Sequence, residues 1–116
     1  MADTSVPTRE GPTVLTATTP DDIVSDPGGA GVQHWVPRQG LVITNSDPQE
    51  NQLAIRIGGV EIDILYVPPA PGDGSNATVF WPGTVVVENG ETLEVEVLTA
   101  YVSGAITATC SYMRTD

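Results

Sequence analysis

The chain has 116 residues and a net charge of −11, from 15 acidic residues against four arginines and no lysine. This length fits one domain with one modest core, and the charge repels phosphate backbones and anionic lipid surfaces. We therefore expect no nucleic-acid partner and no membrane partner. A lysine-free acidic composition is typical of a salt-loving source or of a high-GC genome.

The first 31 residues are rich in proline, glycine and threonine, and only residues 13–18 have the pattern of a strand. Segments of this composition bury little apolar surface of their own. The sequence therefore predicts two parts: an extended N-terminal arm over residues 1–31 and a folded domain over residues 32–116.

The folded part begins with two expected short strands, residues 32–36 and 41–44, and continues into a hairpin over residues 53–64. Gly58 and Gly59 separate two alternating apolar runs, and a two-residue glycine loop suits the primed turns of β-hairpins. Folding the chain at this loop places Ile57 opposite Val60 and Ile55 opposite Ile62. We expect these apolar side chains to share one buried face.

Further strands are expected at residues 78–81, 84–87, 92–98 and 105–113. Asn89-Gly90 predicts a second two-residue hairpin, with Val86 opposite Leu93. No segment shows a helical period, and about eight short strands with polar turns between them are typical of a sandwich. The predicted fold is all-β, an antiparallel two-sheet sandwich of the jelly-roll or immunoglobulin-like kind, with the strand order left open.

The sequence offers no catalytic set and no cofactor site. Cys110 has the alternation of a buried strand residue, and His34, next to Trp35, is expected at the surface or rim. With one cysteine and one histidine the chain cannot form a zinc set on its own. Asp21, Asp22 and Asp26 are weak candidates for a Ca²⁺ loop, although aspartates before glycine and proline are ordinary turn formers.

From about residue 32 onward, the order of turns and strands resembles small β-sandwich virion proteins of tailed viruses. The segments that carry the resemblance are residues 37–40, 41–45, 53–65, 68–72, 79–83, 88–93 and 105–113. The resemblance implies a non-enzymatic structural protein of the virion, foremost a capsid decoration protein. Such a protein docks by its N-terminal arm on the major capsid protein and forms a trimer or pentamer with itself.

Two alternatives remain at this point. One is a tail, turret, spike or fibre component that contacts a host receptor, and the other is a carbohydrate-binding sandwich, which stacks exposed aromatic side chains on sugars. The candidate contacts between subunits are Val14, Leu15, Ile23, Val24 and Trp81.

Overall fold

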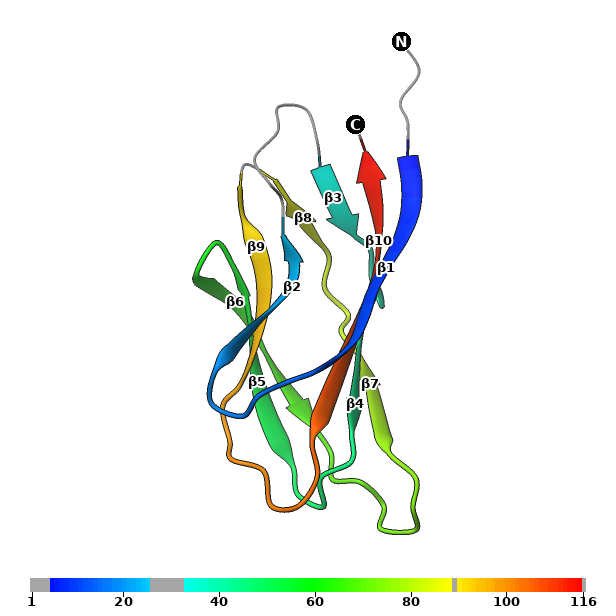
Figure 1. Cartoon of the computed structure of the whole chain (residues 1–116), viewed down its shortest axis with the longest axis vertical. Helices are drawn as coiled ribbons and strands as arrows, with labels where there is room; N and C mark the ends of the chain where they lie inside the picture. Colours follow the sequence, from blue (N-terminus) through cyan, green and yellow to red (C-terminus); the bar gives the residue numbers. More distant parts are fainter. Residues whose placement is uncertain (1–4, 26–32, 89, 116) are drawn as a thin grey trace.

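The computed structural model describes residues 5–25, 33–88 and 90–115. These residues form two antiparallel sheets, so the predicted all-β sandwich is confirmed, with ten strands in place of about eight (Figure 1). The strands are β1 (Ser5–Val14), β2 (Pro20–Ser25), β3 (Gln33–Val36), β4 (Leu41–Asn45), β5 (Asn51–Ile57), β6 (Val60–Val67), β7 (Ala77–Phe80), β8 (Val85–Val87), β9 (Thr92–Val97) and β10 (Ile106–Thr115).

The larger sheet has six strands and is organised around β10. One edge of β10 pairs with β1 along its length, from Ser5 opposite Thr115 to Val14 opposite Thr107. The other edge pairs with β3 near the C-terminus and with β4 over the first half of the strand. β8 pairs with β3 and β7 pairs with β4, which completes the sheet.

The smaller sheet has four strands in the order β2-β9-β5-β6. Gly58 and Gly59 both have positive φ, 57° and 81°, as the expected primed turn requires. The predicted pairing holds next to this turn, with Ile57 opposite Val60. Beyond it a bulge shifts the register by one residue, so Ile55 lies opposite Asp63 and not Ile62.

The bulge changes which side of β6 faces the core. Leu65 and Val67 pack inward, whereas Val60 and Ile62 are 64% and 42% exposed. The expected burial of Val60 and Ile62 is therefore wrong. Ile62 lies at the one-residue shift, which turns the side chains after it to the opposite face, whereas Val60 precedes the shift and is exposed at the end of the hairpin opposite Ile57.

The predicted Asn89-Gly90 hairpin is also wrong. The turn itself is present, since the amide of Glu91 donates to the carbonyl of Glu88 at 3.0 Å. The strands on its two sides then separate: β8 pairs with β3 in the six-stranded sheet, and β9 pairs with β2 and β5 in the four-stranded sheet. A tight turn thus connects the two layers of the sandwich.

The N-terminal segment contains more strand than the sequence predicts. β1 and β2 are both paired within the sheets. The expectation that residues 13–18 form the only strand of this segment is therefore wrong. β1 tolerates Pro7 and Pro12 because it is an edge strand, where a missing amide donor is not required for pairing. The division into an arm and a domain at residue 31 stays a prediction.

The core lies between the sheets and is almost entirely aliphatic. The alternation predicted for the last strand is confirmed, since Ile106, Ala108, Cys110 and Tyr112 all point inward and are buried. Trp81 connects the two sheets. Its Nε1 donates to Oδ2 of Asp63 in β6 at 2.8 Å, and its backbone amide donates to the carbonyl of Leu41 in β4 at 2.9 Å.

A buried polar cluster closes the end of the sandwich between β4 and β10. The carboxylate of Asp47 accepts hydrogen bonds from the successive amides of Val102, Ser103 and Gly104 at 3.0, 2.9 and 3.0 Å. Asn51 donates to the same carboxylate at 3.1 Å. Burial alone raises the pKa of Asp47, but these hydrogen bonds outweigh burial and leave the pKa below its ordinary value of 3.8.

Replacing Asp47 by alanine is expected to lower the free energy of unfolding by about 3 kcal/mol, because it leaves several buried backbone donors without an acceptor. Urea denaturation measures this loss. The matched control is Asp73→Ala, which removes an exposed carboxylate bonded to Ser75 and should leave the midpoint nearly unchanged. Equal midpoints for the two variants would contradict the role given to Asp47.

The same carboxylate makes a defined contribution to acid sensitivity. Because folding lowers the pKa of Asp47, its stabilisation is complete above about pH 4 and is lost as the pH falls through the lower pKa of the folded state. Asp47→Asn removes this titration, so the stability of that variant should fall less steeply with acid than that of the wild type. Parallel stability curves for the two proteins in this acidic range would show that another group is responsible.

Candidate functional site

The outer face of the six-stranded sheet carries a row of apolar side chains. The strand register places Pro7 opposite Met113, Met113 opposite Trp35, and Trp35 opposite Val86, across β1, β10, β3 and β8. We call these four residues the apolar row. Trp35 and Val86 are 46% and 38% exposed.

The alternation of each strand explains why the row faces outward. His34 and Val36 point into the core, which leaves Trp35 on the opposite face of β3. Tyr112 likewise points inward and Met113 outward. The surface expectation for His34 is wrong, because its ring is buried and lies 5.4 Å from the ring of Tyr112.

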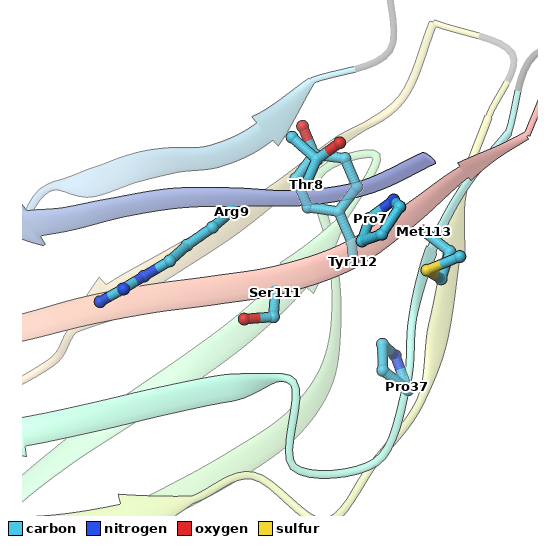
Figure 2. Close-up of a pocket in the computed structure, with 7 residues that line it drawn as sticks. All are labelled: Pro7, Thr8, Arg9, Pro37, Ser111, Tyr112 and Met113. Carbon is cyan, nitrogen blue, oxygen red and sulfur yellow. The ribbon is translucent and has the colours of Figure 1, made fainter. Parts of the chain in front are cut away.

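An open groove of about 330 Å³ lies at one end of the apolar row. Its lining comes from three separate parts of the chain: Pro7, Thr8, Arg9, Pro37, Ser111, Tyr112 and Met113. Figure 2 shows Pro7, Met113 and Pro37 gathered toward one end, and Arg9 with Ser111 toward the other. The groove therefore combines an apolar end with one positive charge.

Tyr112 supports the groove from the core side. Its hydroxyl donates to Oε1 of Glu10 at 3.1 Å, and burial followed by the hydrogen bond and negative charge of Glu10 raises the pKa of Tyr112. The hydroxyl consequently stays protonated at neutral pH and acts as a hydrogen-bond donor. It holds β1 against β10 at the base of the groove.

The predicted metal candidates do not gather into a site. Oδ2 of Asp21 accepts the amide of Thr16 at 2.8 Å, as a turn-forming aspartate does, and Asp22 is exposed. Asp26 lies outside the described residues. The part of the chain that the structure describes contains no group of three metal-ligating side chains and no helix suited to crossing a bilayer.

The predicted contacts between subunits fall in two environments. Leu15, Ile23, Val24 and Trp81 are buried in the core of the chain itself, whereas Val14 is 67% exposed. A role between subunits stays a prediction for this set. Sequence reasoning missed the apolar row, because only the register of four strands brings its members together.

No family model matches the chain, and no curated protein matches it. One solved structure, of Bacillus endospore appendages described as a novel family of disulfide-linked pili, is 13% identical with a TM-score of 0.42, covering 97% of this chain and 85% of that one.

The structure found is a pilus and not a virion component, which overturns the viral interpretation. The expected resemblance to virion proteins, the roles in capsid decoration or in a tail, turret, spike or fibre, and the virion location are all wrong, and the comparisons give no support to a capsid partner. At this identity and TM-score, the similarity assigns no other function in their place.

Cys110 is expected to be chemically inert in the folded chain. Burial, followed by the charge of Glu10, raises the pKa of its thiol to about 12, so almost no thiolate forms at neutral pH. A thiol reagent such as DTNB should react slowly with the native chain and rapidly with the urea-unfolded chain. Equal rates in the two states would contradict the buried position of Cys110.

Proposed function

We propose that the chain is a non-enzymatic structural subunit that associates with further copies of itself. The observation that carries the proposal is the apolar row on the outer face of the six-stranded sheet. The outer face of an antiparallel sheet is usually polar, and a continuous apolar surface on it is typical of an interaction site. A tryptophan near the middle of the row is the residue type that contributes most at such contacts.

Several polar groups of the described residues are used to hold the fold. Asp47 and Asn51 fix the loop after β9, Asp63 fixes Trp81, and Glu10 fixes Tyr112. Each of these groups directs hydrogen bonds to a neighbouring strand or loop. This use of polar side chains supports a structural role and gives no support to catalysis.

The net charge of −11 opposes association between copies, since like-charged subunits repel one another. Apolar area must therefore supply the favourable free energy of assembly. Val14, 67% exposed on β1, is the member of the predicted contact set that is placed to add to such an area.

Sedimentation velocity at increasing protein concentration tests the proposal. The wild-type chain should form oligomers, and Trp35→Ser should weaken association by about tenfold or more, because it removes the largest exposed side chain of the row. Val102→Ser is the matched control, since Val102 is 65% exposed in the loop before β10 and outside the row. A wild-type chain that stays monomeric at millimolar concentration would contradict the proposal.

A further inference from the structure

We propose that the groove beside Pro7 receives the tip of the β5–β6 hairpin of a second copy, with Arg9 of one subunit against Glu61 of the next. This inference rests on the self-association proposed above and names the two surfaces that meet. The proposed contact is made by apolar side chains and is flanked by one pair of opposite charges.

The hairpin tip has the right composition for such a contact. Val60 and Ile62 are 64% and 42% exposed, and the exposed Glu61 lies between them. Val60 lies next to the turn at the end of the hairpin and Ile62 lies at the bulge, so neither side chain enters the core of its own subunit. β6 is also the edge strand of the four-stranded sheet, so the tip projects without a strand on its outer side.

The groove has the complementary composition. Its volume of about 330 Å³ lies within the range of binding clefts, roughly 300–1,000 Å³. Pro7, Pro37 and Met113 supply apolar surface at one end, and Arg9 lies toward the other end (Figure 2). Aliphatic side chains that carry an acid between them match both parts of this lining.

The distribution of positive charge singles out the groove. The chain contains four arginines and no lysine. Arg56 is already paired with Glu96 at 3.2 Å on the four-stranded sheet. Arg9 lines the groove, and the exposed Arg38 and Arg114 directly follow the lining residues Pro37 and Met113 along the chain. On a molecule of net charge −11, this is where an acidic segment of a second copy meets positive charge.

The two surfaces lie on opposite flanks of the subunit. In Figure 1 the β5–β6 hairpin is at the left, and the β1–β10 pair is at the right. A contact between two different surfaces is heterologous, so a bound pair keeps one free tip, on one subunit, and one free groove, on the other. Assembly then grows in one direction into a filament or closes into a ring, and it does not stop at a symmetric dimer.

Charge reversal tests the pairing. Arg9→Glu and Glu61→Arg should each weaken self-association by about tenfold or more, since each places like charges together at the contact. The double variant R9E/E61R should recover assembly. Glu50→Arg makes the same change of net charge as Glu61→Arg at an exposed turn, and it should leave association unchanged. Sedimentation velocity gives the oligomer size, and thermal unfolding confirms that each variant is folded.

Mixing the two single variants gives a further readout. Every contact between unlike variants joins opposite charges, whereas every contact between like variants joins equal charges. The mixture should therefore assemble with the two variants alternating in a 1:1 ratio, and an excess of either should stay unassembled.

If both single variants assemble like the wild type while Trp35→Ser prevents assembly, the pairing of Arg9 with Glu61 is overturned and the proposal of a self-associating subunit stands. If the wild type never assembles, both proposals fail.

Discussion

β10 pairs with three other strands, and this pairing determines both the hydrophobic core and the groove. β1 occupies one edge of this strand, while β3 and β4 share the other. The register of β10 decides which residues enter the core: Cys110 and Tyr112 point inward, and Ser111 and Met113 point outward. One strand thus provides both the centre of the hydrophobic core and the floor of the groove, and a shift of its register would remove both.

The parts of the fold that could be predicted are those with regular alternation. The burial pattern of β10 and the glycine turn between β5 and β6 follow from local sequence. Apolar residues alternate along a half-buried strand, and glycine is favoured where φ is positive. The bulge in β6 has no comparable pattern in the sequence. Its effect on Ile62 arises from the pairing of Asp63 with Ile55 and of Leu65 with Leu53, which depends on the packing of the whole layer.

Two further errors have a common physical origin. A turn sequence predicts a reversal of the chain, but it does not say whether the following strand pairs with the preceding one. The turn at Gly90 reverses the chain between two layers, and β8 and β9 find their partners elsewhere. In the same way, the prolines of β1 argued against a strand, although Pro7 is compatible with an edge position next to β10.

The candidate site depends on this long-range pairing, since Pro7, Pro37 and Met113 are far apart in sequence. Hydrophobicity alone selected Leu15 and Trp81, which belong to the core.

Hydroxyl-radical footprinting of dilute and assembled wild-type protein shows whether the apolar row on the outer face of the six-stranded sheet is the contact surface. Radical labelling reports the exposure of individual side chains, and both Trp35 and Met113 react readily with radicals. Phe80, 53% exposed on β7, provides an internal reference outside the apolar row. Trp35 and Met113 should lose labelling on assembly while Phe80 keeps it. Unchanged labelling of Trp35 and Met113 in assembled protein, with protection at Phe80 in their place, would contradict the proposed contact surface.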